Sequence, residues 1–291
     1  GGTSMYKIAI DIGGTNIKVA VINDDLEMID YKKIKTPDNI NVQIVDETYQ
    51  LVAAFMKQYQ LKNPFIGISS AGVVDSDLGQ IIYTGPTIPN YDGTQFFEVF
   101  KDLSSDIAVY NDVDAALLGE LKLHHYEEDN IFCLTLGTGI GGAFYSQASG
   151  IYQGSRHRAN KIGYLLYREE DGKTFEQRAS TSALKDLMTK HQFEHGTDVP
   201  RLFNLAEDGN EEALNILNEW SNYVAEGIAQ IQIIYDPSLI LIGGGISSQG
   251  ETLLKYIEPK IHHYLPSDYG IAKIQTTQTE NHAALFGAIT K

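Results

Sequence analysis

Short apolar stretches alternate along the chain with longer segments in which apolar residues recur every three to four positions. The short stretches predict strands at residues 6–11, 17–22, 28–34, 65–69, 80–83, 107–110, 239–242 and 271–275, and a hairpin over 132–144. The longer segments predict helices at residues 42–59, 182–190, 211–235, 252–264 and 283–289, and one that begins at Asn111-Asp112 and runs through Leu121. Because strands lead into helices, we expect βαβ units with a parallel component and an α/β fold class.

Two stretches share one plan: an apolar strand, a turn rich in glycine and a second apolar strand. The first spans residues 8–21 and turns at Gly13 and Gly14, and the second spans residues 132–144. Glycine in such turns is expected to allow positive φ and the close approach of another group to the backbone. Backbone N–H groups beside the carboxylate of Asp11 suit a phosphate with its magnesium ion. An ordinary hairpin explains either copy alone, so it is the repetition that favours a phosphate chain held by two similar lobes.

The length and the repeat predict two domains with a cleft between them. We expect an N-terminal lobe over residues 5–125 and a C-terminal lobe over residues 126–291, with the C-terminal helix able to pack back on the N-terminal lobe. Residues 1–4 precede Met5 and resemble the remnant of an expression tag, which takes no part in the fold.

Composition and charge exclude several classes of protein. Apolar residues make up 43% of the chain, which is enough for sizeable cores, and the formal net charge of 22 − 38 = −16 argues against nucleic acid or an anionic membrane as the main partner. The single cysteine, Cys133, rules out a disulfide within the chain and disfavours a cysteine-based zinc site. Because the sequence shows no signal peptide and no apolar run of about 18 residues, we expect a cytoplasmic protein.

Three glycine-containing motifs together resemble the nucleotide motifs of the actin-like ATPase superfamily and, within it, those of the ROK family of sugar kinases; they span residues 11–15, 135–142 and 243–245. Residues 67–75 and 111–116 match that family's sugar-side motifs, and the resemblance extends over the chain from Met5. It implies a two-lobe, ribonuclease H-like fold with a duplicated core. Residues 86–91 and 163–167 further resemble the zinc-lacking N-acetylmannosamine kinases of the family, which implies phosphorylation of that sugar's 6-hydroxyl in sialic acid catabolism.

The resemblance implies that ATP and Mg²⁺ bind at the glycine motifs, with Asp11 near the ion. The ATP-binding residues that it implies are Asp11, Gly13, Gly14, Thr15, Asn16, Lys18, Thr135, Gly137, Thr138, Gly139, Gly243, Gly244 and Gly245. Taken alone, the triple glycine is accounted for as well by a plain strand-to-helix turn.

On the sugar side, the resemblance implies contacts from Gly72, Asn90, Asn111, Asp112, Tyr164 and Glu176. Asp112 is the candidate general base, because phosphoryl transfer to a hydroxyl needs a carboxylate within hydrogen-bond reach of its proton. Asn and Asp at a helix start are also ordinary caps. Glu176 and Ser180 fit the family's Glu-x-x-x-Ser element, whose glutamate faces the anomeric end of the sugar; the alternative is a solvated loop carboxylate.

The chain departs from the family pattern in one region. The family often carries Glu-x-Gly-His and a cysteine-rich zinc loop, but here residues 161–164 read Lys-Ile-Gly-Tyr and no further cysteine is present, so no structural zinc is expected. Tyr164 keeps a hydroxyl where the histidine stands. Lys161 reverses a charge near the sugar's 2-substituent, which leaves the sugar preference open. Residues 191–195 match the His-x-x-Glu-His pattern of some zinc proteases, but Gly196 follows at once, so we interpret the match as chance.

The predicted function is therefore an ATP-dependent sugar kinase whose partners are a small sugar and ATP, with a homodimer expected from the family. The alternatives within the family are β-glucoside kinases, glucokinases and fructokinases. A sugar-responsive repressor would carry a helix-turn-helix domain before the first strand, for which the start at Met5 leaves no room. A catalytically inactive sugar sensor is disfavoured by the presence of Asp11 and Asp112.

Overall fold

The computed structural model describes residues 6–291; the predicted tag remnant at residues 1–4 lies outside the described residues. The chain separates into two units. The first unit contains the chain up to Tyr126, Gln153–Ala159 and Asn281–Lys291, and the second contains Glu127–Tyr152 and Asn160–Glu280. In the part of the chain that the structure describes, no helix is long and apolar enough to cross a membrane.

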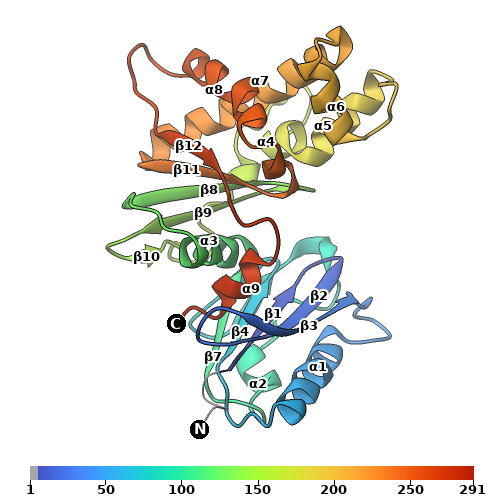
Figure 1. Cartoon of the computed structure of the whole chain (residues 1–291), viewed down its shortest axis with the longest axis vertical. Coiled ribbons are helices and arrows are strands. Elements are labelled where there is room, and N and C mark those ends of the chain that lie inside the picture. Colours follow the sequence, from blue (N-terminus) through green and yellow to red (C-terminus); the bar gives the residue numbers. More distant parts are fainter. Residues whose placement is uncertain (1–5) are drawn as a thin grey trace. The chain divides into compact units, whose positions relative to one another are not determined.

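The first unit is built on a five-stranded sheet in the order β3-β2-β1-β4-β7. Its strands are β1 (Lys7–Ile12), β2 (Asn16–Ile22), β3 (Met28–Lys35), β4 (Ile66–Ser70) and β7 (Ile107–Asn111), and a separate ribbon pairs β5 (Val73–Asp75) with β6 (Gln80–Tyr83). Helices α1 (Ile44–Gln58) and α2 (Phe96–Val99) lie on one face of the sheet, and α3 (Asp112–Leu123) and α9 (Ala283–Ala288) lie on the other (Figure 1).

Strand β1 shows how the sequence pattern sets the two faces. Ile8, Ile10 and Ile12 are buried in the core on the α1 side, whereas Ala9 packs with Leu285 of α9. Because side chains alternate along a strand, Asp11 lies on the α9 face at the carboxyl end of β1. The short side chain of Ala9 leaves room for α9. Asp11 follows it on the same face, at the end of the strand, and hydrogen-bonds to Ser69 there.

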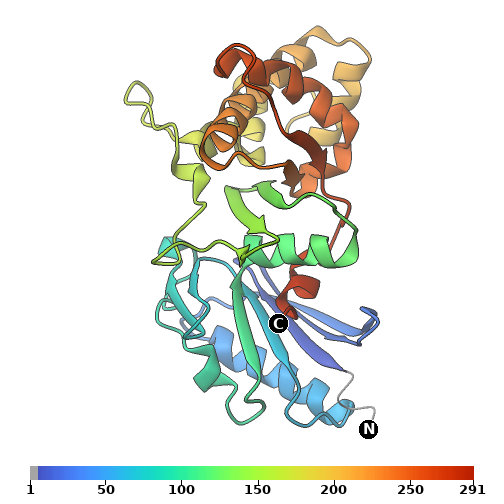
Figure 2. The same ribbon diagram turned by 90° about the vertical axis from the view of Figure 1, so that its left-hand side faces the viewer.

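The second unit repeats this topology with a sheet in the order β10-β9-β8-β11-β12. Its strands are β8 (Asn130–Leu136), β9 (Ile140–Ser146), β10 (Gly150–Ile151), β11 (Leu239–Gly243) and β12 (Lys273–Thr276). In both sheets an antiparallel hairpin is extended by two parallel strands, so the predicted duplicated core is confirmed. Its helices, α4 (Phe175–Ala179), α5 (Thr181–Lys190), α6 (Val199–Glu207), α7 (Glu211–Tyr235) and α8 (Glu251–Ile261), gather on one face of the sheet (Figures 1 and 2).

The structure corrects the sequence prediction in several places. Helices α2, α4 and α6 and strand β5 were not predicted, and the helix expected over 252–264 ends at Ile261 and continues as a 3₁₀ turn, His262–Tyr264. Further 3₁₀ turns lie at Gly85–Thr87, Ile162–Tyr164 and Gly245–Gln249. The strand expected over 271–275 is Lys273–Thr276.

Candidate functional site

The first glycine turn joins β1 to β2 and is closed by the N–H of Gly13, which donates to the carbonyl oxygen of Asn16 at 3.0 Å. The hydroxyl of Thr36 donates to the carbonyl oxygen of Gly13 at 2.7 Å. Neither Gly13 nor Gly14 has a positive φ, so the expectation that these glycines serve backbone conformation is wrong. A Cβ built on Gly14 would lie 3.4 Å from Cγ2 of Thr87, an ordinary contact distance. A Cβ on Gly13 would lie 3.3 Å from the carbonyl oxygen of Asn16, a tight contact, so the turn itself favours glycine at Gly13, and space for another group is the remaining reason at Gly14.

Asp11 precedes this turn and lies between two polar partners across the sheet. Lys18 on β2 and Ser69 on β4 stand opposite it in register, and the Ser69 hydroxyl donates to Asp11 Oδ1 at 3.0 Å. Burial raises the pKa of Asp11, while the Ser69 hydrogen bond and the charge of Lys18 act in the opposite direction. The carboxylate is thus held in a weakly solvated place, where a bound cation would favour its charged form.

At the carboxyl end of β7, Asn111 is the N-cap of α3. Its Oδ1 accepts from the N–H groups of Val113 at 2.9 Å and Asp114 at 3.4 Å, and its Nδ2 donates to the carbonyl oxygen of Gly72 at 2.6 Å. Asp112 is the first helical residue and half-buried. Asn111, and not Asp112, is therefore the N-cap of α3, so capping does not account for Asp112.

The buried tyrosine Tyr91, which the sequence did not mark out, has its hydroxyl at the end of β4. Its hydroxyl and that of Ser70 lie 2.6 Å apart. Burial raises the pKa of Tyr91, the hydrogen bond with Ser70 lowers it, and the charges of Asp11 and Asp112 raise it. The only sequence signal for this group was the polar pair that ends the buried strand β4.

Two predicted sugar contacts lie on loops of the first unit with positive φ. Gly72 has a φ of 95°, and a Cβ there would lie 2.6 Å from the carbonyl oxygen of Tyr83, so only glycine fits. Asn90 has a φ of 57° and is exposed, and its Nδ2 donates to the carbonyl oxygen of Asn39 at 3.1 Å. The structure thus joins Gly72 directly to Asn111, whereas Asn90 bonds to a separate loop.

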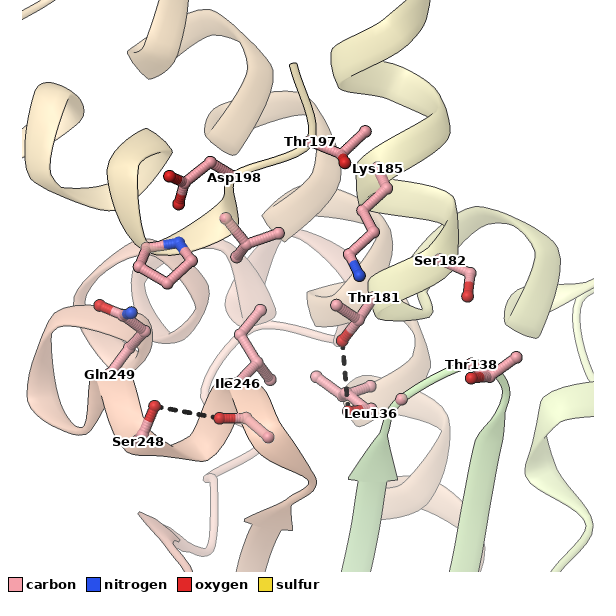
Figure 3. Close-up of a pocket in the computed structure, with 14 residues that line it drawn as sticks. Leu136, Thr138, Thr181, Ser182, Lys185, Thr197, Asp198, Ile246, Ser248 and Gln249 are labelled. Carbon is pink, nitrogen blue, oxygen red and sulfur yellow. Dashed lines mark hydrogen bonds between the residues drawn. The ribbon is translucent and has the colours of Figure 1, made fainter. Parts of the chain in front are cut away.

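In the second unit the other two glycine motifs line one pocket of about 360 Å³ (Figure 3). The residues that line it are Leu136, Gly137, Thr138, Thr181, Ser182, Lys185, Thr197, Asp198, Val199, Pro200, Gly245, Ile246, Ser248 and Gln249. A Cβ built on Gly137 or on Gly245 would meet nothing within 4 Å. These two glycines therefore border open space, which a ligand can occupy.

Two neighbouring glycines of these motifs, Gly244 and Gly139, answer to the protein's own backbone and packing. Gly244 has a φ of 94°, and a Cβ there would overlap the carbonyl of Leu136. Gly243 ends β11 in register with Thr135 of β8. A Cβ on Gly139 would overlap Oε1 of Glu176. None of these three glycines lines the pocket.

Much of the pocket lining carries no motif in the sequence and was not predicted, including Lys185, Asp198 and Pro200. Among the described residues that line it, Lys185 is the one cation and Asp198 the one carboxylate. Figure 3 shows the Lys185 ammonium beside Thr181, and the Asp198 carboxylate accepts from the N–H of Arg201 at 3.0 Å as the N-cap of α6. An apolar wall with a few hydroxyls and one ammonium suits a phosphorylated ligand with an apolar body.

The residues that depart from the family pattern lie on a short segment whose Gly163 is close to Glu176. Lys161 is the N-cap of the 3₁₀ turn at Ile162–Tyr164, and Tyr164, the last residue of that turn, is 70% exposed. A Cβ on Gly163 would lie 3.3 Å from Oε1 of Glu176. Glu176, on α4, accepts from the N–H of Ile140 at 2.8 Å, so it is not a solvated loop carboxylate.

Two features bear on metal chemistry. Residues 191–195 follow the end of α5 in turns instead of continuing a helix, which agrees with a chance match to the protease pattern. Cys133 is buried in β8. Elsewhere, in the described chain, Asp75, Asp77 and His157 are the one group whose ligand atoms lie close enough to share an ion, and Asp75 already caps its own turn by accepting from two backbone N–H groups.

Comparisons with known proteins agree with this geometry. The ROK family model matches residues 7–290. A protein of Clostridium perfringens with no assigned function is 31% identical over 96% of this chain and 95% of its own length. A beta-glucoside kinase of Listeria innocua is 27% identical over 97% of this chain and 95% of its own length.

Two solved structures show the same fold. A ROK family glucokinase from Streptomyces griseus, in complex with glucose and AMPPNP, has a TM-score of 0.80 and 24% identity over 98% of both chains. A Listeria monocytogenes protein described as a candidate N-acetylmannosamine kinase has a TM-score of 0.83 and 24% identity over 98% of this chain and 97% of its own.

Proposed function

The chain belongs to the ROK family, and from this premise we propose that it transfers the γ-phosphoryl group of ATP to the 6-hydroxyl of a hexose, N-acetylmannosamine. The coarser prediction of a phosphotransferase with an alcohol acceptor is confirmed by relatives that are named as sugar kinases over nearly their whole length. The proposal assigns activation of the sugar to the first unit and binding of the nucleotide to the second.

The observation that carries the nucleotide assignment is the pair of open glycines. Gly137 and Gly245 come from separate motifs and border the same pocket. A Cβ built on either glycine would have no protein atom within 4 Å, so the space beside both is open. The N–H of Gly137 is used within the turn, where it donates to the carbonyl oxygen of Gly139 at 2.9 Å. The Lys185 ammonium at this pocket supplies a positive charge for a phosphate.

Asp112 is the base in this proposal. Its carboxylate accepts the proton of the 6-hydroxyl as the hydroxyl oxygen forms a bond to the γ-phosphorus and the bond from that phosphorus to the bridging oxygen of ADP breaks. The products are the sugar 6-phosphate, ADP and the proton left on Asp112. Asn111 fixes the first turn of α3 through its cap, so it orients the base.

Magnesium fits the first unit through the chemistry of its donors. Asp11 offers a carboxylate oxygen. Mg²⁺ prefers hard oxygen ligands and is usually bound by one or two carboxylates together with substrate phosphates. The ion, when bound, neutralises charge on the phosphate oxygens. Burial raises the pKa of Asp11 because it disfavours the charged carboxylate, and a bound cation would stabilise that charge.

The choice of N-acetylmannosamine is supported by the likeness of residues 86–91 and 163–167 to kinases of that sugar. The Tyr164 side chain is exposed, so its hydroxyl is accessible to a ligand. A β-glucoside or glucose is the rival substrate, which the names of the relatives favour.

We also propose a homodimer, which light scattering of the purified protein would test.

The test is magnesium- and ATP-dependent release of ADP with N-acetylmannosamine, N-acetylglucosamine, glucose, mannose, fructose and cellobiose. Selectivity for N-acetylmannosamine is expected, whereas preference for a glucoside would keep the kinase and replace the sugar. Asp112→Asn should lower kcat by about 10²–10⁴-fold with sugar affinity largely kept, since only proton acceptance is removed. Wild-type protein that binds ATP but turns over no sugar would overturn the proposed reaction.

A further inference from the structure

The turn of the second glycine hairpin, residues 137–139, is held by one segment of the second unit. The N–H groups of Thr181 and Ser182 donate to the carbonyl oxygen of Gly137 at 3.0 and 3.3 Å, and the Thr181 hydroxyl donates to the carbonyl oxygen of Leu136 at 3.2 Å. On the far side of the turn, the N–H of Ile140 donates to Oε1 of Glu176 at 2.8 Å. The segment 176–182 therefore makes hydrogen bonds to the turn on both of its sides.

Glu176 fills the space beside this turn. A Cβ on Gly139 would overlap its Oε1, so the glycine at that position accommodates the carboxylate. Within residues 6–291 no hydrogen bond reaches the other oxygen, Oε2. One oxygen is thus committed to the phosphate-side turn, and the second is available to a ligand.

Packing fixes the helix that carries Glu176. The ring of Phe175 lies against Gly227 of α7, where a Cβ would overlap it. Thr174 and Gln177 form a capping box at the start of α4, and the Glu176 carbonyl oxygen accepts from the N–H of Ser180 at 3.1 Å. These contacts fix the backbone that carries Glu176 beside the turn.

We propose that Glu176 is a positioning residue for the nucleotide phosphates as well as a sugar contact. Its hydrogen bond to Ile140 sets the turn at residues 137–139, and a sugar hydroxyl that donates to Oε2 holds the same carboxylate in place. Sugar and nucleotide therefore strengthen each other's binding through one side chain, and by linkage the effect is equal in both directions. This coupling rests on the proposed function, but the role of Glu176 toward the turn does not require that a particular sugar bind.

The first test measures binding of the magnesium complex of AMPPNP by calorimetry, without sugar. Glu176→Ala removes the acceptor for the Ile140 N–H, and Glu176→Asp keeps the charge but shortens the side chain so that it no longer reaches. Both should weaken AMPPNP binding about tenfold, which is the loss of one hydrogen bond to a charged acceptor. Glu176→Gln keeps an oxygen acceptor, so its affinity should stay within about threefold of wild type. Glu170→Ala, an exposed acid of the preceding loop, is the matched control and should change nothing.

The second test repeats the titrations with saturating N-acetylmannosamine. Wild type should bind AMPPNP several-fold more tightly with sugar, and Glu176→Ala should lose that gain. Unchanged AMPPNP affinity in both Glu176→Ala and Glu176→Asp would overturn the positioning role. If Glu176→Ala does not fold, the comparison of Glu176→Asp with Glu176→Gln decides the same point. Failure of the proposed function gives a different result, because the wild type would then turn over no sugar while the sugar-free titrations still separate the variants.

Discussion

Asn111 offers a sharp test of how the first unit holds its candidate base. The side chain is buried and makes three hydrogen bonds, of which two accept from the first turn of α3 and one donates to the carbonyl oxygen of Gly72. Asn111→Ala removes all three at once. It therefore frees the start of the helix on which Asp112 is the first residue, and it leaves Gly72 without its side-chain donor.

The expected cost follows from these bonds. Loss of an N-cap costs about 1 kcal/mol, and leaving a carbonyl without its donor costs about 1–2 kcal/mol more. The sum of about 2–3 kcal/mol lowers the Tm by roughly 3–5 °C for a chain of this size. Because the first turn of α3, which carries Asp112, is then held less firmly, kcat of the proposed kinase should fall by about tenfold or more.

Two further substitutions separate the cap from the bond to Gly72. Asn111→Ser keeps a capping oxygen and loses only the donor, so it should recover about 1 kcal/mol relative to alanine. Asn111→Asp keeps the cap but sets a carboxylate oxygen against the Gly72 carbonyl, so it should be less stable than serine. Hydrogen exchange at the N–H groups of Val113 and Asp114, with calorimetric Tm values, provides the measurement. Alanine within about 0.5 kcal/mol of wild type, or serine no better than alanine, would refute the reasoning.

Three more predictions concern other parts of the structure. Gly287→Ala places a methyl group into the Ala115 carbonyl at the α3–α9 contact, so thermal unfolding should show a loss of about 1–3 kcal/mol. Asp11→Asn should abolish turnover yet raise the Tm at neutral pH. Burial raises the pKa of Asp11 in the folded protein above its ordinary 3.8, so ionisation of this carboxyl opposes folding. The gain in Tm should therefore grow as the pH rises above about 4 and vanish below it. Lys185→Ala should raise the KM for ATP about tenfold in steady-state assays and leave the KM for the sugar unchanged, and an equal rise in both would contradict its place in the nucleotide pocket.

Much of the fold could be predicted because its elements are locally encoded. The strand at residues 80–83 and the helix at residues 211–235 have the predicted bounds, and the repeated glycine hairpin correctly indicated two similar sheets. In these segments the hydrophobic period is uninterrupted and the ends carry turn or capping residues, as Asn210 does at the start of α7 through its bond from the N–H of Ala213. Local pattern and tertiary burial therefore agree.

The pocket that Gly137 and Gly245 border could not be assembled from the sequence in the same way. Its lining comes from four stretches, residues 136–138, 181–185, 197–200 and 245–249, which only packing brings together. Helix α6 is short and carries Pro200 in its first turn, so its apolar period was too brief to stand out from the polar loop before it. In the sequence, Lys185 looks like one more exposed lysine on an amphipathic helix.

The glycines show most clearly what a motif conceals. A run of glycines can reflect a positive φ, as at Gly244, a close protein neighbour, as at Gly139, or space left open, as at Gly137 and Gly245. Alanine at the first two positions must disturb the protein itself, so both the Tm and nucleotide affinity should fall. At Gly137 and Gly245 an added methyl group meets no protein atom, so the Tm should stay within about 1 °C while AMPPNP binding weakens, since surface changes away from packed features cost little. If Gly137→Ala unfolded at a clearly lower temperature with nucleotide affinity intact, the open space beside it would have no role in binding, and the assignment of the pocket to ATP would lose its main support.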